Sequence, residues 1–103
     1  MKKVKITAMR QTAYPDLTEQ YEMPGHACDI RVGDVFIAQG HHCPDGFCQS
    51  AWMSLYPFVI ALSSGGGDFY DGWMKNKTSA MISCNDGFRP MSYLLETLEE
   101  EDV

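Results

Sequence analysis

The feature that most constrains the fold is a long apolar segment that runs from Cys48 to Ser63. Its apolar side chains recur at spacings of four and three residues, which places them on one stripe of an α-helix. This stripe consists of Cys48, Trp52, Leu55, Val59 and Leu62. The segment is also apolar on a second side, so we expect the helix to be largely enclosed. Pro57 lies inside it and has no backbone N–H to donate, which predicts a kink.

Period-two alternation elsewhere predicts strands over residues 4–10 and 80–84, and a short apolar run predicts another over 35–38. Residues 90–98 are expected to form the last strand, as the second strand of a terminal hairpin. The last two strands flank Asn85-Asp86-Gly87, a tight reversal typical of a hairpin. Basic residues near the start and acidic residues near the end favour pairing of the first and last strands. Pro15 and Asp16 predict a short helix over 14–21. The fold expected is α+β: a mainly antiparallel sheet of about four strands, packed against one long kinked helix, with one short extra helix.

Length and charge narrow the class of protein. With 103 residues, the chain is expected to form a single domain over residues 1–103. The longest unbroken apolar run, 56–62, is far shorter than the ~20 residues that span a bilayer, and the N-terminus resembles neither a signal peptide nor a lipidation site. A net charge of -6 without a basic patch disfavours nucleic acid. We therefore expect a soluble cytoplasmic protein that binds neither nucleic acid nor membranes.

Four cysteines, in a chain expected to be cytoplasmic, favour free thiols, a metal site or a redox site over disulfides. Cys43 and Cys84 each begin a Cys-x-Asp-Gly-Phe turn, where backbone N–H groups can point back at sulfur. Cys48 is the first residue of the predicted helix, where the partial positive charge of the helix N-terminus would lower the pKa of its thiol. Burial at this position would raise that pKa instead. The spacing of Cys43 and Cys48 matches no specific motif.

Convergence of distant residues would create a site. Cys28, Cys48 and Cys84, with a histidine such as His26, would supply the four ligands of a zinc or iron–sulfur site. His41 and His42 are further candidate ligands, although histidines in such a loop are more often solvated. The alternative is that all four cysteines are simply small apolar residues in or near the core.

Three other residues are candidate ligand-binding groups. Trp52 and Trp73 would line a pocket, although aromatic residues in so small a domain mostly belong to the core. Arg89 would bind a carboxylate, for which the alternative is a structural ion pair with Asp86.

Several motifs together resemble a family of small prokaryotic proteins of about 100 residues with unassigned function. The resemblance covers nearly the whole chain, and its most specific parts are Pro44-x-Gly46-Phe47-Cys48 and Cys84-x-Asp86-Gly87-x-Arg89-Pro90. It implies a complete stand-alone protein and no particular activity. It also implies that Cys28, Cys48 and Cys84 are family cysteines, whereas Cys43 is particular to this chain. Family members tend to have Cys-Pro at 28–29 and Cys-Cys at 83–84, where this chain has Cys28-Asp29 and Ser83-Cys84. The resemblance therefore disfavours a metal site of four cysteines shared by the family, and the simplest ligand set that it implies is three thiols plus a histidine or water.

Three hypotheses for function follow. The first is a site at Cys28, Cys48 and Cys84 that binds a metal or a small thiol-reactive ligand. The second is an enzyme in which Cys48 is a nucleophile or redox thiol and a histidine carries the proton. The third is a binding or assembly module that forms a homodimer through the aromatic loop Phe69–Met74.

Overall fold

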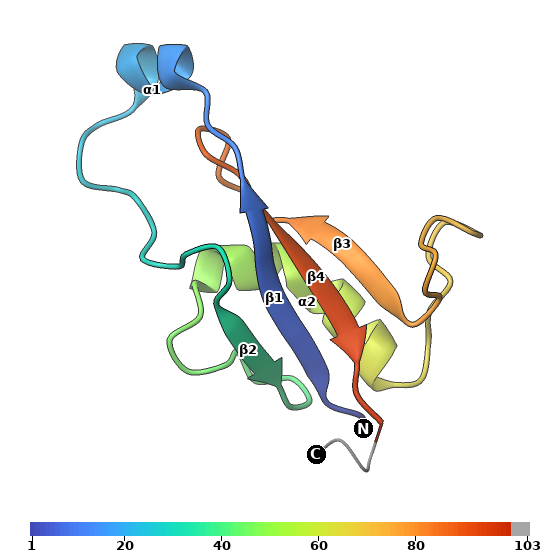
Figure 1. Cartoon of the computed structure of the whole chain (residues 1–103). Helices are drawn as coiled ribbons and strands as arrows, with labels where there is room; N and C mark the ends of the chain where they lie inside the picture. Colours follow the sequence, from blue (N-terminus) through green and yellow to red (C-terminus); the bar gives the residue numbers. More distant parts are fainter. Residues whose placement is uncertain (100–103) are drawn as a thin grey trace.

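The computed structural model of the chain describes residues 1–99. Within these residues, four antiparallel strands form one sheet in the order β2-β1-β4-β3, and two helices accompany it (Figure 1). The strands are β1 (Val4–Gln11), β2 (Val35–Ala38), β3 (Ser79–Ser83) and β4 (Met91–Thr97). The helices are α1 (Pro15–Tyr21) and α2 (Gln49–Ser63). The α+β class, the antiparallel sheet and the pairing of the first and last strands are as expected from the sequence.

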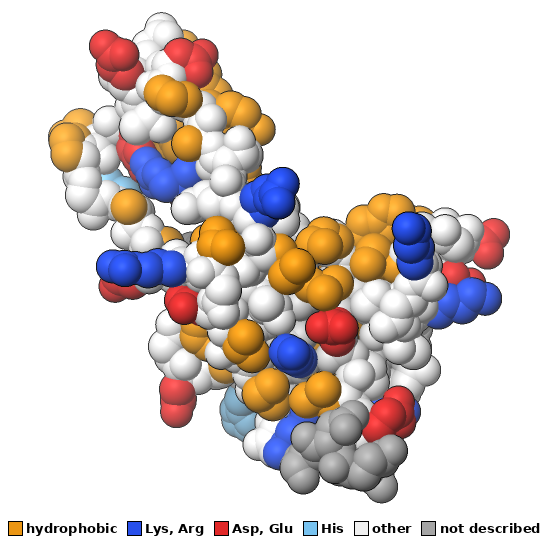
Figure 2. Space-filling model, viewed as in Figure 1, with side chains coloured by type: hydrophobic (Ala, Val, Ile, Leu, Met, Phe, Trp, Pro, Cys, Tyr) orange, Lys and Arg blue, Asp and Glu red, His pale blue; other side chains and the backbone are white. Residues whose placement is uncertain are grey.

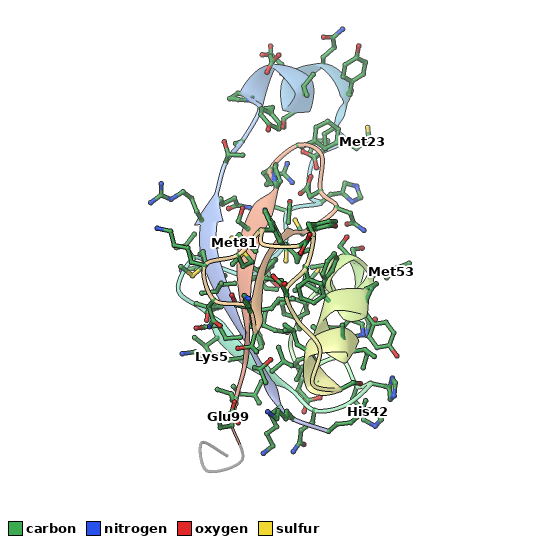
Figure 3. The ribbon with its side chains drawn as sticks, turned by 90° about the vertical axis from the view of Figure 1, so that its right-hand side faces the viewer. Lys5, Met23, His42, Met53, Met81 and Glu99 are labelled. Carbon is green, nitrogen blue, oxygen red and sulfur yellow. The ribbon has the colours of Figure 1, made fainter. Side chains whose placement is uncertain are left out.

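The core lies between α2 and one face of the sheet. On β1, Val4, Ile6 and Ala8 are buried while the residues between them are not, which is the alternation that a half-covered strand requires. They pack against the stripe of α2 that includes Leu55 and Val59, both fully buried. The opposite face of the sheet has no helix on it among residues 1–99, and Figure 3 shows the sheet edge-on with α2 to one side.

Helix α2 has 15 residues and is continuous through Pro57, so the expectation of one long kinked helix is not confirmed. Pro57 cannot donate to the carbonyl of Met53. Met53 is 74% exposed and Pro57 is exposed as well, so this interruption lies on the side of the helix that water reaches. Solvent can therefore satisfy the unpaired carbonyl, and the buried stripe on the other side stays intact.

Helix α1 projects beyond one end of the sheet (Figure 1) and has no buried residue. Backbone hydrogen bonds attach its start to the connection between β3 and β4: Tyr14 N–H donates to the carbonyl of Phe88 at 2.8 Å, and Thr12 N–H donates to that of Pro90 at 3.2 Å. This projection makes the molecule elongated, with extents of 46 × 30 × 20 Å.

The connection between β3 and β4 spans residues 84–90, so the predicted hairpin is present but its loop is longer than the tight reversal expected from Asn85-Asp86-Gly87. The side chain of Asp86 organises this loop by accepting hydrogen bonds from the backbone N–H groups of Phe88 and Arg89. The additional residues let Arg89 turn back towards Asp86, which matters for the site described next.

Candidate functional site

A pocket of about 260 Å³ lies where the loop before β2, the start of α2 and the connection between β3 and β4 meet. Cys28, Cys48 and Cys84 come from these three segments, and all three line it. We call it the three-cysteine pocket. The other residues that line it are Gln11, Glu22, His26, Ile30, Ser50, Ala51, Asn85, Asp86, Arg89, Met91 and Tyr93. The fold thus brings together three cysteines that are far apart in the sequence.

Cys28 belongs to the loop that precedes β2, and its sulfur accepts a hydrogen bond from the backbone N–H of Ile30 at 3.5 Å. Burial raises the pKa of the Cys28 thiol, and the neighbouring Cys48 raises it further through its charge and a side-chain hydrogen bond, whereas the bond from Ile30 lowers it. Cys28 and Cys48 are therefore neighbours in the three-cysteine pocket. Cys28 nevertheless remains exposed, so reagents in solution can reach it.

Cys84 follows β3, and its sulfur accepts a hydrogen bond from the backbone N–H of Met91 at 3.2 Å. Whereas the sulfur of Cys84 accepts a hydrogen bond, the thiol of Cys43 donates to the carbonyl oxygens of Pro44 and Phe47, at 3.7 and 3.9 Å. Burial raises the pKa of Cys43, with a further contribution from Cys48. The two Cys-x-Asp-Gly-Phe turns are therefore not equivalent, and Cys43 does not line the pocket.

Cys48 is the N-cap residue of α2, with φ −68° and ψ 122°. Within residues 49–52, the first turn, no backbone N–H donates to its sulfur. What distinguishes Cys48 is instead that it neighbours Cys28 in the pocket and raises the pKa of that thiol. Asn85 holds this end of α2 against the β3–β4 connection, because its side-chain amide donates to the carbonyl of Ser50 at 3.0 Å.

Tyr93 on β4 lines the pocket from the sheet side and is 2% exposed. Burial raises the pKa of its phenol strongly, and the nearby Cys84, Cys28 and Cys48 raise it further. The phenol therefore stays protonated and can donate a hydrogen bond to a bound group. We did not single out Tyr93 from the sequence, although its alternation with Met91 and Leu95 could have placed it on the buried face of the strand.

Arg89 closes one side of the pocket through two ion pairs. Its guanidinium contacts Glu22, which lies just after α1, and also Asp86 at 3.2 Å. The hydrogen bond that Arg89 donates to Glu22, together with the charges of both carboxylates, raises the pKa of Arg89. The ion pair with Asp86 was one of the two alternatives weighed from the sequence. Arg89 lines the pocket, but the two carboxylates that it binds are side chains of the protein, Glu22 and Asp86, and not a carboxylate ligand.

The remaining candidate residues are divided between the pocket and other places. His26 lines the pocket, whereas His41 hydrogen-bonds the hydroxyl of Tyr56 on α2 and lines a separate hollow of about 330 Å³. Trp52 is 7% exposed and packs in the core against Phe47 and Tyr56. Trp73 pairs with Tyr70 in the loop after α2 and does not line the three-cysteine pocket. Of the three candidate ligand-binding residues, only Arg89 therefore lines it.

Metal ligation by Cys28, Cys48, Cys84 and His26 receives no support from the structure. Within residues 1–99, no three His, Cys, Asp or Glu side chains are grouped so that they could hold a metal ion. A Zn–S bond is ~2.3 Å long, so three ligands must converge on one point. The three cysteines line one pocket of about 260 Å³, but residues can line the same pocket without their sulfur atoms meeting at one point.

Comparison of the chain with models of protein families, with curated proteins and with solved structures finds no match. The family resemblance inferred from the motifs therefore stays a prediction. No helix within the described residues is both long and apolar enough to cross a membrane.

Proposed function

We propose that this chain is a small protein that binds a thiol-reactive ligand in the three-cysteine pocket. The observation that supports the proposal is that Cys28, Cys48 and Cys84, from three distant segments, line one pocket while Cys43 does not. A ligand there meets soft, polarisable sulfur atoms on one side and the protonated phenol of Tyr93 on another. His26 is the histidine placed to exchange a proton with such a ligand.

The proximity of Cys28 and Cys48 in one pocket supports two-point attachment. A reagent that bonds two neighbouring thiols is held more tightly than one that bonds a single thiol, because the second bond forms within the same molecule. Phenylarsine oxide is a probe of this kind: two S–As bonds form, and the oxygen leaves as water with the two thiol protons. The experiment is intact-mass spectrometry of the reduced chain after treatment with one equivalent of this reagent.

We expect one phenylarsenic group per chain, resistant to excess monothiol and removed by a dithiol. Cys28→Ser or Cys48→Ser should abolish this resistance, and the matched control Cys43→Ser should leave it unchanged. Equal loss in all three variants, or no stable adduct with the wild-type chain, would contradict the proposal. Circular dichroism of each variant shows whether the fold is retained.

A second candidate function, thiol–disulfide exchange, is favoured by the same proximity of Cys28 and Cys48 in the pocket. The thiolate of Cys48, at the start of α2, would attack a low-molecular-weight disulfide and release one thiol. The thiolate of Cys28 would then attack the mixed disulfide, forming the Cys28–Cys48 bond and releasing the second thiol. Overall the chain is oxidised by two electrons and the small disulfide is reduced to two thiols.

Oxidised glutathione separates this function from simple ligand binding. Exchange predicts an internal Cys28–Cys48 disulfide in the wild-type chain and a persistent glutathione adduct on Cys48 in Cys28→Ser, because the resolving thiol is gone. Peptide mapping without reduction measures both products. Adducts spread evenly over all four cysteines would count against the exchange function.

A further inference from the structure

The face of the sheet that α2 does not cover carries a mixture of apolar and charged side chains. Register places these residues, because cross-strand partners point to the same face. One row across the sheet is Val35, Thr7, Leu94 and Met81, and the next contains Ile37, Lys5 and Glu96. Figure 3 shows Lys5 and Met81 on the side away from α2, which carries Met53.

Three apolar residues of this face are substantially open to solvent: Val35 is 49% exposed, Ile37 43% and Met81 37%. They lie on the two outer strands, β2 and β3, at opposite edges of the sheet. Figure 2 looks onto this face and shows apolar side chains spread over it, with basic and acidic ones between them. A sheet face of this kind has the apolar content of a surface that packs against another one.

Lys5 and Glu96 are direct cross-strand partners on β1 and β4, the two central strands. The described part of the chain nevertheless contains no ion pair between them, since the ion pairs found there join Lys2 to Glu99 and Arg89 to Glu22 and Asp86. One positive and one negative charge thus lie side by side on the two central strands, near one end of the open face. A surface with this arrangement is complementary to its own copy.

We propose that two copies of this chain associate through their open sheet faces, around a two-fold axis that runs along the strands between β1 and β4. The rotation places Lys5 opposite the partner's Glu96 and Glu96 opposite the partner's Lys5. Two equivalent ion pairs therefore form across the interface. Because the axis passes through the middle of the strand order, β2 faces β3 of the partner subunit. Val35 then meets the partner's Met81, and the exposed apolar residues at both edges are covered.

Charge reversal tests this arrangement. Lys5→Glu places two carboxylates opposite each other at both ends of the pair, and Glu96→Lys places two ammonium groups there, so each variant alone should be monomeric. Mixing the two variants restores an opposite charge at both positions and should yield a heterodimer. Light scattering coupled to size exclusion should give twice the chain mass for the wild type and for the mixture, and the single-chain mass for each variant alone.

Three results would overturn the proposal. They are a monomeric wild type at the highest concentration that stays in solution, a dimer unaffected by either charge reversal, and a mixture that stays monomeric although both variants retain the wild-type circular dichroism spectrum. Trp73→Ala is the control for the aromatic loop Phe69–Met74. We expect it to leave the dimer intact, and dissociation by Trp73→Ala with no effect of the charge variants would assign the contact to that loop instead.

Discussion

Cys28 and Cys48 are neighbours in the three-cysteine pocket, although Cys28 lies in the loop before β2 and Cys48 is the N-cap residue of α2. A charge on Cys48 therefore opposes a charge on Cys28. Together with burial, this raises the pKa of Cys28 above its ordinary value, so Cys28 keeps its proton at neutral pH.

Stability should fall at alkaline pH. Burial holds the pKa of Cys28 above its ordinary value of 9.0 and that of Tyr93 above 10.0. Above about pH 9, the folded chain keeps protons on Cys28 and Tyr93 that the unfolded chain loses. The contribution of these two groups to the free energy of unfolding is therefore fully present below about pH 9, and it is lost as the pH rises through their pKa values in the folded chain. Urea denaturation at several pH values from 8 upwards should show the decline, and Tyr93→Phe should make it shallower. An unchanged slope in Tyr93→Phe would contradict the role of the phenol.

Substitutions in α2 should separate its two sides. Leu55 is fully buried, so Leu55→Ala leaves a cavity and should cost about 2–5 kcal/mol of the free energy of unfolding. Met53→Ala is the matched control, because Met53 is 74% exposed and its loss should change stability by less than about 0.5 kcal/mol. Chemical denaturation measures both. Similar costs for the two variants would mean that the helix is oriented differently.

The end of α2 is joined to the N-terminal segment by Ser63, whose buried hydroxyl donates to the carbonyl of Lys2. The backbone reinforces this contact, since Lys2 N–H donates to the carbonyl of Ser63 at 2.8 Å. Ser63→Ala leaves the carbonyl without its side-chain donor and should destabilise the fold by about 1 kcal/mol. Ser64→Ala, at an exposed neighbour, provides the comparison and should have a smaller effect on thermal unfolding.

Removing the guanidinium of Arg89 should loosen the loop that carries Cys28. Arg89 joins Glu22, at the start of that loop, to Asp86 in the β3–β4 connection. Arg89→Gln breaks both ion pairs, so alkylation of Cys28 by iodoacetamide should become faster at constant pH. Arg31→Gln removes an exposed arginine of the same loop and should leave the rate unchanged. Equal rates in the wild type and Arg89→Gln would show that the ion pairs do not restrain Cys28.

Local patterning in the sequence was sufficient to predict most of the elements. The strand expected at 35–38 matches β2, and the helix expected from Cys48 to Ser63 differs from α2 by one residue. The helix and the strands at 4–10 and 80–84 are indicated by apolar side chains that repeat every 3.6 or two residues along the chain, and the strand at 35–38 by a short apolar run. The kink expected at Pro57 is not confirmed: α2 is continuous from Gln49 to Ser63, and the carbonyl of Met53, which Pro57 leaves unpaired, lies on the solvent side.

The sequence by itself determined which residues were chemically capable: the cysteines, the histidines and Arg89. Only the tertiary structure decided that Cys28, Cys48 and Cys84 share a pocket with His26, that Cys43 and His41 lie elsewhere, and that Tyr93 and Glu22 belong to the site. The physical reason is that each of these contacts joins residues from different elements. Their distances depend on the order of strands in the sheet and on the path of the loops, which no local periodicity encodes.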